Sequence, residues 1–362
     1  MARIDMQGIA HSYMADPKSE ADYALKQLDV SWTDGGAYSL LGPSGCGKTT
    51  LLNIISGLVI PFEGSVRFDG RDVTRLSTQE RNIAQIFQFP VIYDTMSVHD
   101  NLAFPLRNRK VPEKEVRRRV AEVAELLDLT ADLKRRASGL TADIKQIISL
   151  GRGLVRSDVA AVLLDEPLTV IDPHVKWLLR RRLKQIHEQL HLTMIFVTHD
   201  QTEAMTFADQ VVLIYDGVVV QHGTPEELFE RPRHSFVGYF IGDPGINMLP
   251  CAIDNNQLVV GGCPFLVSEA LARKLPKASG KLALGIRPVY CELASQAGPG
   301  SFDARVERVK NLGDYQLVTA RLAEHSFRAR LSMKEKVEVG AQTRFRFPEA
   351  RIQLFADDIA VQ

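Results

Sequence analysis

One short stretch limits the possible folds of this chain more than any other. It fits the pattern G-x-x-x-x-G-K-[ST] of a phosphate-binding loop. Its residues are Gly42, Pro43, Ser44, Gly45, Cys46, Gly47, Lys48, Thr49 and Thr50. Glycines in such a loop let backbone N–H groups converge on phosphate oxygens, and the helix that follows offers its positive N-terminus. Lys48 can reach the β- and γ-phosphates, and the Thr49 hydroxyl can bind Mg²⁺.

The residues on either side of this loop fit a strand, a loop and a helix in succession. Residues 37–41 form a short apolar run with the composition of a buried strand. Residues 50–55 continue with the apolar stripe of a helix. A chance match in a flexible glycine-rich loop would lack this context. The sequence therefore predicts a nucleotide site at the end of a strand.

Composition limits the class of protein. The 362 residues are long for one domain and suit two. Hydrophobic residues make up 45% of the chain and charged residues 24%, as in soluble proteins with a well-formed core. The 44 basic residues balance 44 acidic ones, which argues against a polyanion-binding surface, so we expect no nucleic-acid partner.

Neither a membrane-spanning helix nor a secretion signal is predicted. No apolar run approaches the roughly 18–20 residues that cross a bilayer, and the first residues lack the apolar core of a signal peptide. The four cysteines show no metal-binding spacing, and Cys46 lies inside the phosphate loop, where it cannot serve as a disulfide staple. We therefore expect a cytosolic compartment.

The order of the predicted elements indicates an α/β fold. Buried strands are expected at residues 37–41, 83–88, 160–166 and 193–199. Helical patterns separate them, which favours a mostly parallel sheet covered on both faces.

Two further regions of the first 240 residues have a different character. Residues 3–10, 25–32 and 64–73 have the pattern of an antiparallel β subdomain. From about 91 to 157 the periodicity becomes helical, and we expect a helical subdomain in which the run Arg117 to Arg119 lies on a solvated face.

The pattern changes again near residues 235–250. Short alternating strands and Gly/Pro turns follow, which is typical of a small β-barrel. The clearest of these strands are expected at 282–286, 304–309, 316–321 and 326–331. We therefore predict two domains, residues 1–240 and 241–362.

Polar residues follow three of the predicted buried strands, where α/β sheets form their ligand crevice. Asp165 suits Mg²⁺ binding opposite Thr49, and the adjacent Glu166 is placed to polarise an attacking water as a general base. His199 could contact the γ-phosphate and hold that water. Gln88 could join the metal shell and sense the γ-phosphate. Alone, each could be a solvated strand end or a structural side chain; with the phosphate loop, in this order, they favour a nucleotide-hydrolysing site.

These motifs together resemble the ATP-binding subunits of ABC transporters. Gly42–Thr49 matches the Walker A motif, Gln88 the Q-loop and residues 162–167 the Walker B motif. Residues 168–172, ending in Asp172, match the D-loop, and residues 197–200 match the switch-histidine region. The resemblance implies an ABC ATPase fold that binds ATP and Mg²⁺.

Other segments resemble the maltose-importer-like group of that family. They are residues 102–106, 223–228, 241–250 and 284–288, and the last two resemble a C-terminal transport-associated domain of OB type. The resemblance implies an ATPase that energises import of a small carbohydrate, polyol or glycerol-type solute. It implies a peripheral position on the cytoplasmic face of the bacterial inner membrane. The implied partners are two membrane permeases, docked near residues 88–96, and indirectly a periplasmic solute-binding protein.

An aromatic side chain is expected to stack on the adenine ring. Tyr13 falls where the family places this residue, but an insertion of about six residues before the next strand makes Tyr23 a competitor. We favour Tyr13. A tyrosine that only packs at the sheet edge is the alternative.

The chain departs from the family at the signature motif, which usually reads Leu-Ser-Gly-Gly-Gln. The residues at that place are Leu140, Thr141, Ala142, Asp143, Ile144, Lys145 and Gln146. The motif normally offers N–H groups and a helix N-terminus to the γ-phosphate on the opposite subunit. Asp143 would oppose that phosphate: two unit charges about 4 Å apart, at an effective dielectric near 20, repel by roughly 4 kcal/mol. Thr141 and Asp143 are also good N-cap residues for a helix expected to begin near Ile144.

This departure has a consequence for assembly. ABC ATPases pair head to tail, so each nucleotide lies between the phosphate loop of one chain and the signature of the other. We therefore expect a heterodimer with a second ABC ATPase that has an intact signature, in preference to a homodimer. A regulatory ATP-binding module with slow turnover is an alternative, and a soluble non-transport ABC ATPase is another. The sequence does not identify the solute.

Overall fold

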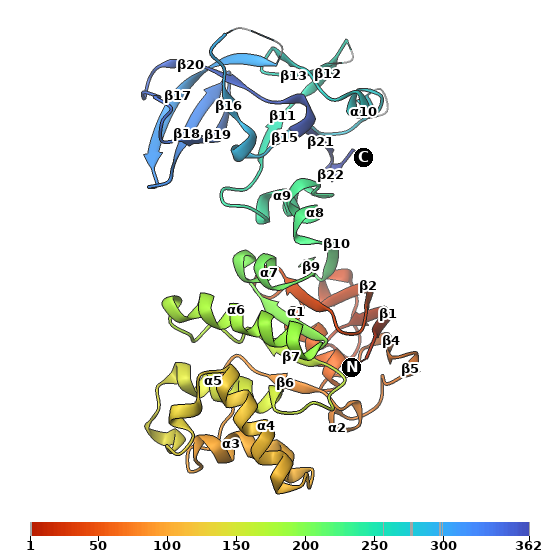
Figure 1. Ribbon diagram of the computed structural model, residues 1–362. Coiled ribbons are helices and arrows are strands. Elements are labelled where there is room, and N and C mark those ends of the chain that lie inside the picture. Colours follow the sequence, from red (N-terminus) through yellow and green to blue (C-terminus); the bar gives the residue numbers. More distant parts are fainter. Residues whose placement is uncertain (1, 256, 276–277, 297, 299, 362) are drawn as a thin grey trace. The chain divides into compact units, whose positions relative to one another are not determined.

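The computed structural model describes residues 2–255, 257–275, 278–296, 298 and 300–361. They form two compact units, one that ends at Pro225 and one that begins at Glu226 (Figure 1). The limits of the two domains expected from the sequence remain a prediction, at residues 1–240 and 241–362.

The first unit is built on a six-stranded sheet in the order β10-β9-β3-β8-β7-β6 (Figure 1). All neighbouring pairs are parallel except β9 and β10. The strands are β3 (Ala37–Leu41), β6 (Ala84–Ile86), β7 (Val162–Asp165), β8 (Met194–Thr198), β9 (Gln210–Tyr215) and β10 (Val218–Gly223). Every residue of β3 and β8 is buried, as a sheet covered on both faces requires. The expected mostly parallel sheet is confirmed.

A second, antiparallel sheet follows the order β2-β1-β4-β5. Its strands are β1 (Ile4–His11), β2 (Leu25–Trp32), β4 (Glu63–Phe68) and β5 (Arg71–Asp72). This is the antiparallel β subdomain that the alternating residues predicted.

Four helices accompany these sheets. They are α1 (Lys48–Ser56), α2 (Thr78–Arg81), α6 (Pro173–Leu190) and α7 (Gln201–Phe207). The apolar side of α1, including Leu51 and Ile55, shares one hydrophobic core with residues of both sheets, such as Met6 and Val197. The phosphate loop therefore leads into a helix that is fixed by packing.

Three further helices make up the helical subdomain: α3 (Val98–Asn108), α4 (Glu113–Leu126) and α5 (Ala142–Leu154). Short 3-10 turns occur as η1 (Glu20–Asp22), η2 (Thr130–Asp132) and η3 (Ala137–Gly139). The expected helical subdomain is confirmed (Figure 1), and its limits at about 91–157 remain a prediction.

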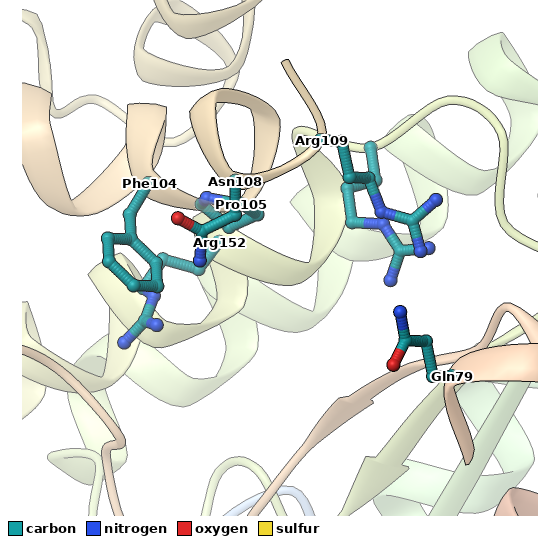
Figure 2. Close-up of a pocket in the computed structure, with 7 residues that line it drawn as sticks. Gln79, Phe104, Pro105, Asn108, Arg109 and Arg152 are labelled. Carbon is teal, nitrogen blue, oxygen red and sulfur yellow. The ribbon is translucent and has the colours of Figure 1, made fainter. Parts of the chain in front are cut away.

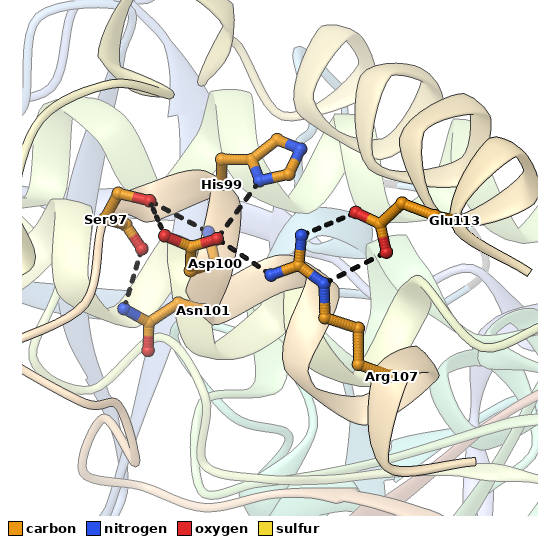
Figure 3. A network of polar contacts seen from close by, with 6 residues as sticks. All are labelled: Ser97, His99, Asp100, Asn101, Arg107 and Glu113. Carbon is orange, nitrogen blue, oxygen red and sulfur yellow. Dashed lines mark hydrogen bonds and ion pairs between the residues drawn. The ribbon is translucent and has the colours of Figure 1, made fainter. Parts of the chain in front are cut away.

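A polar network fixes the start of α3 and joins it to α4 (Figure 3). Ser97 caps the helix, because its hydroxyl accepts a hydrogen bond from the Asp100 N–H at 3.0 Å. The Ser97 hydroxyl donates to the Asp100 carboxylate at 2.6 Å. Arg107 then bridges Asp100, at 2.8 Å, and Glu113 of α4, at 2.6 Å. The network lowers the pKa of Asp100 to about 2, first through the Ser97 hydrogen bond and then through Arg107.

The prediction of a solvated arginine run on α4 is wrong at one position. Arg117 and Arg118 are exposed, but Arg119 is only 6% exposed. Its guanidinium donates to the carbonyls of Val155 and Leu154 at 3.2 and 3.3 Å, and so caps the C-terminus of α5. A positive group is favourable at that end of a helix because the carbonyls there lack intrahelical partners.

In its described residues, the second unit is mainly antiparallel β structure with three short α-helices: α8 (Pro225–Glu230), which begins on the last residue of the first unit, α9 (Ser235–Phe240) and α10 (Glu269–Ala272). Its largest sheet has the order β16-β20-β17-β18-β19. The strands are β16 (Glu292–Leu293), β17 (Ser301–Asn311), β18 (Tyr315–Leu322), β19 (His325–Ser332) and β20 (Gln342–Arg346). These strands cover three of the four that the sequence predicted in this region.

Two smaller sheets complete the unit, in the orders β11-β15-β21-β22 and β12-β13-β14. The strands are β11 (Asn247–Pro250), β12 (Ala252–Asp254), β13 (Gln257–Val260), β14 (Cys263–Phe265), β15 (Leu282–Ile286), β21 (Gln353–Ala356) and β22 (Ile359–Ala360). The turns η5 (Pro288–Tyr290) and η6 (Glu349–Arg351) connect strands. Strand β15 has the predicted bounds, and the expected all-β C-terminal fold is confirmed.

The core of this unit is rich in phenylalanine. Phe265, Phe302, Phe327, Phe345 and Phe347 are buried and make ring contacts with centroids 4.7–6.3 Å apart. Such contacts add to the free energy that burial of the rings already contributes.

Candidate functional site

The phosphate loop lies between β3 and α1, and its glycines are required by its geometry. Gly47 has φ +102°, and a Cβ there would approach the Ala24 carbonyl oxygen to 2.5 Å. A Cβ on Gly42 would come within 2.1 Å of the Ile214 carbonyl oxygen. Only glycine fits at these positions. The backbone can therefore form a cradle of N–H groups.

Lys48 is held in this loop although it carries a charge. It is 5% exposed, and its ammonium donates to the carbonyls of Gly42 at 2.9 Å and Pro43 at 2.8 Å. Cys46 is buried beside it, with its sulfur 3.9 Å from the Lys48 nitrogen, and burial raises the pKa of the thiol. The loop thus has a positively charged donor at the place where the sequence predicts phosphate binding.

The predicted metal ligands Thr49 and Asp165 lie together. The Thr49 hydroxyl donates to the Asp165 carboxylate at 3.2 Å, although 116 residues separate them in the chain. Burial raises the pKa of Asp165, an effect that the Thr49 hydrogen bond partly offsets. A hydroxyl and a carboxylate are the hard oxygen donors that Mg²⁺ prefers, so this pair fits the metal.

Glu166 and His199 form a second pair at the same edge of the sheet. The register places Asp165 opposite Val197, so the residues that follow β7 and β8 leave the sheet side by side. His199 Nδ1 lies 3.2 Å from the Glu166 carboxylate, and the Thr169 hydroxyl donates to the same oxygen at 3.2 Å. The Glu166 backbone has φ +44° and its N–H donates to the Val197 carbonyl at 3.0 Å. Two side chains therefore hold this carboxylate, and the Val197 carbonyl holds the backbone that carries it.

Gln88 is not joined to these pairs by a hydrogen bond among the described residues. It lies in a bend shortly after β6, which is parallel to β7 with Ile86 opposite Leu164. The two strands therefore end at the same edge. Gln88 therefore lies at the same edge of the sheet as Asp165, and its role in the metal shell remains a prediction.

Tyr13 and Tyr23 lie in different surroundings. The Tyr13 hydroxyl is 3.1 Å from that of Thr50 in α1, and its ring is 68% exposed. His11, which is buried, contacts the Tyr13 ring edge to face at a centroid distance of 4.7 Å. Tyr23 instead contacts Phe62, at 6.1 Å. Tyr13 is therefore the tyrosine that lies beside the phosphate-loop helix.

The chain between these tyrosines is ordered by a small hydrogen-bond network. The Ser12 hydroxyl donates to the Asp22 carbonyl at 2.7 Å. The Asp22 carboxylate accepts from the N–H groups of Lys18 and Ser19 at 2.7 and 2.8 Å. The insertion is thus closed at its base just beside Tyr13.

The degenerate signature lies at the N-terminus of α5. The helix begins at Ala142, two residues earlier than expected, with Thr141 as the N-cap residue. Thr141 therefore occupies the N-cap position that its residue type favours, but its side chain makes no capping hydrogen bond. Leu140 is 8% exposed and Asp143 is half-buried. Asp172 of the D-loop caps the next long helix, α6, by accepting from the His174 N–H at 2.9 Å.

The sequence reasoning missed a cluster of arginines beside the helical subdomain (Figure 2). A cavity of about 670 Å³ is lined by Gln79, Phe104, Pro105, Asn108, Arg109, Arg152 and Arg156. Asp158 is 2.8 Å from Arg109 and 3.7 Å from Arg156. A smaller cavity of about 180 Å³ shares Pro105, Arg152 and Arg156 and reaches Phe87, next to Gln88. Arg109 lies more than 40 residues before Arg152 and Arg156 in the chain, so no local sequence pattern marks the three as a cluster.

The described residues contain no helix that is both long and apolar enough to span a bilayer. They also contain no cluster of three or more His, Cys, Asp or Glu side chains that could hold a metal ion by themselves. A Mg²⁺ at Thr49 and Asp165 would need further ligands, which phosphate oxygens can supply.

Comparisons with known proteins agree with this geometry. The ABC transporter family model matches residues 25–169, and the TOBE domain model matches residues 284–355. The chain is 35% identical over 360 residues to the sn-glycerol-3-phosphate import ATP-binding protein UgpC of Escherichia coli O157:H7, and the match covers 98% of each chain. It is 37% identical over 344 residues to UgpC of Bordetella pertussis, covering 94% of this chain and 92% of that protein.

A solved structure shows the same fold. It is cbiO1 from Clostridium perfringens, part of the ABC transporter complex cbiONQ, with a TM-score of 0.58 and 24% identity over 63% of this chain and 90% of that one. The geometry of the phosphate loop and of the Asp165 and Glu166 carboxylates points to the same family as the TOBE match and the near-full-length relatives. The chain therefore belongs to the ATP-binding proteins of ABC transporters, in the group whose ATPase domain is followed by a TOBE domain.

Proposed function

We propose that this chain is the ATPase subunit of an importer for a glycerol phosphate or a related polyol or sugar. The relatives that match nearly its whole length are named as sn-glycerol-3-phosphate import proteins, which supports this class of solute. The observation that carries the proposal is the convergence of Lys48, Asp165 and the Glu166–His199 pair at one sheet edge.

Each of these residues has a part in ATP hydrolysis. Lys48 and the loop N–H groups bind the β- and γ-phosphates. Thr49 and Asp165 would hold Mg²⁺, which neutralises phosphate charge when bound. Glu166 accepts a proton from the attacking water, and His199, 3.2 Å away, holds that water against the γ-phosphate. Gln88 completes the site as the residue that senses the γ-phosphate.

Tyr13 holds the adenine ring. Its exposed ring leaves a face free for stacking, and its hydroxyl contact with Thr50 places that ring beside the nucleotide loop. Stacking of this kind tolerates any base and contributes about 1–3 kcal/mol.

The chain works as one half of a heterodimer. Its own α5 begins with Thr141, Ala142 and Asp143, and the half-buried Asp143 carboxylate would repel a phosphate at the helix N-terminus. A second ABC ATPase with an intact signature would complete the site formed by this chain's phosphate loop. The opposite site, completed by α5 of this chain, would be poor.

Membrane permeases dock on the arginine-lined cavity and the adjoining Q-loop. Arg109, Arg152 and Arg156 make this surface positive, and Phe104 and Pro105 make part of it apolar (Figure 2). A short permease segment that carries a carboxylate and apolar side chains fits such a surface. This docking places the chain on the cytoplasmic face of the inner membrane, with the periplasmic solute-binding protein on the other side of the permeases.

The docking surface can be tested with one arginine and a matched control. Arg109→Glu reverses a charge that lines the cavity. Arg118→Glu reverses a charge outside the cavity, on the exposed face of α4. We expect Arg109→Glu to abolish co-purification with the permeases and Arg118→Glu to retain it, with ATP binding unchanged in both. Equal retention of the permeases by both variants would contradict this site.

Transport itself is tested with the complex in proteoliposomes. We expect ATP-dependent uptake of radiolabelled sn-glycerol 3-phosphate, glycerol or a sugar, and its loss when this chain carries Glu166→Gln. If every partner is present and the complex binds ATP without turnover, the regulatory alternative is correct instead.

A further inference from the structure

One buried side chain links the two loops that carry Gln88 and Glu166. Gln146 of α5 is 0% exposed. Its amide nitrogen donates to the Phe87 carbonyl at 3.1 Å and to the Pro167 carbonyl at 3.0 Å. Phe87 directly precedes Gln88, and Pro167 directly follows Glu166. Both amide hydrogens are therefore used between two segments of the proposed catalytic site.

The orientation of this amide is fixed by its surroundings. A flipped amide would place its oxygen against two carbonyl oxygens, which repel it, so only the observed orientation gives hydrogen bonds. The amide oxygen is buried and has no hydrogen-bond partner among the described residues. An unpaired buried acceptor is costly. The unpaired oxygen offsets part of what the two hydrogen bonds contribute to stability, so packing alone does not account for an amide at this position.

Other side chains of α5 hold only one of the two loops. The Ser149 hydroxyl accepts from the Val91 N–H at 3.4 Å, and Arg152 donates to the Val91 carbonyl. These residues lie at three-residue spacing from Gln146, on the same side of the helix. They bind the segment after β6, whereas Gln146 also reaches the segment after β7.

We propose that Gln146 is a positioning residue that sets the loop of Glu166 relative to the loop of Gln88 and makes both follow α5. The inference rests on the proposed function, because it takes Glu166 as the general base. Glu166 is fixed on one side by Val197 and His199, and Gln146 fixes the next residue on the other side. A displacement of α5, the helix that begins with the signature, is thereby transmitted to the catalytic carboxylate.

The test uses Gln146→Met, which keeps the volume and removes both hydrogen bonds. Turnover is measured in the complex with the permeases and the second ATPase, and MgATP affinity is measured on the isolated chain. We expect kcat to fall about tenfold or more, since small misplacements of catalytic groups have effects of that size, with the MgATP Kd within about twofold of wild type. Ser149→Ala is the matched control and is expected to retain kcat.

Three results would overturn the inference: an unchanged kcat in Gln146→Met, a parallel loss of kcat and MgATP affinity, or an equal loss of kcat in Ser149→Ala. If Gln146→Met does not fold, Gln146→Asn, which is too short to reach both carbonyls, is expected to show the same separation of kcat from Kd. Failure of the proposed function is distinguishable, because the wild-type complex would then lack turnover.

Discussion

At the scale of single residues, Asp165 is the carboxylate that we propose as a ligand of Mg²⁺. Its carboxylate accepts from Thr49 at 3.2 Å, and burial raises its pKa. We predict that Asp165→Asn lowers the affinity for MgATP about tenfold or more, because a charged ligand is lost. The affinity for ATP in the presence of EDTA should not fall.

Titration calorimetry with and without Mg²⁺ checks this prediction. Asp314→Asn, an exposed aspartate of the second unit, is the control and should match wild type under both conditions. An equal loss of affinity with and without metal would show that Asp165 acts on the fold of the loop rather than through Mg²⁺.

We predict different effects on ATP affinity for alanine substitutions of the two tyrosines. Tyr13→Ala should weaken ATP binding about tenfold, since loss of one stacked aromatic side chain costs about 1–3 kcal/mol. Tyr23→Ala removes a ring that packs on Phe62 and should leave the affinity within about twofold. Fluorescence titration with a labelled ATP distinguishes them, and the reverse order of effects would assign the base to Tyr23.

The residues that sequence reasoning found and missed differ in a physical way. The residues that were predicted belong to short-range sequence patterns, because a phosphate loop and a strand end are local structures. They are Lys48, Thr49, Asp165 and Glu166. Gln146 and the arginine cluster are defined only by contacts between distant segments, such as the 59 residues between Gln146 and Phe87. No local pattern marks such contacts.

At the scale of elements, the start of α3 offers a pH-dependent test. The pKa of Asp100 is lowered to about 2 from 3.8, so the folded state favours its charged form. Its contribution to stability is therefore present above about pH 4 and is lost as the pH falls through 3.8 toward 2. The Asp100 side chain is 46% exposed, and solvent screening limits the contribution to about 1 kcal/mol.

We predict that Asp100→Asn lowers the free energy of unfolding by about 1 kcal/mol at pH 7, and that the difference shrinks as the pH falls through that window. Urea unfolding between pH 7 and pH 3 measures it. Asp132→Asn, which affects only the exposed Arg135, should have a smaller effect, and a difference for Asp100→Asn that grows toward pH 3 would contradict the account.

The signature segment at the N-terminus of α5 differs from the family motif by the charge of Asp143 and by the loss of two glycines. Asp143→Gly should raise the ATPase rate of the isolated chain about tenfold or more, because the repulsion that it removes, roughly 4 kcal/mol, exceeds the 1.4 kcal/mol of a tenfold change. Asp143→Asn, which removes only the charge, should give part of the gain. Steady-state ATPase assays of the three proteins test this, and no gain in either variant would show that the charge is not the obstacle.

The elements themselves were largely predictable from the sequence. The strands of the six-stranded sheet are short apolar runs, and strand β15 begins and ends where its residues indicated. The errors fall where tertiary contacts override local patterns. Arg119 is buried because α5 ends beside it, and α5 begins two residues early, with Thr141 as N-cap residue but without a side-chain capping hydrogen bond.

At the scale of the whole molecule, we propose that this chain provides one efficient ATP site and needs a second, different ATPase chain to complete it. Its phosphate loop, the proposed metal ligands Thr49 and Asp165, and the Glu166–His199 pair are joined by hydrogen bonds or short contacts. Its own α5 carries Asp143 in the first turn, which would make that N-terminus a poor phosphate site. The two halves of an ABC site are therefore of unequal quality within one chain, and a head-to-tail heterodimer would pair the good half with a good partner.

The most direct measurement compares two complexes, each with one disabled site. In the first, this chain carries Glu166→Gln; in the second, the corresponding glutamate of the partner ATPase is replaced in the same way. We predict that the first loses nearly all ATP turnover and uptake and that the second retains most of both. Equal losses in the two complexes, or ordinary turnover by a homodimer of this chain alone, would contradict the account.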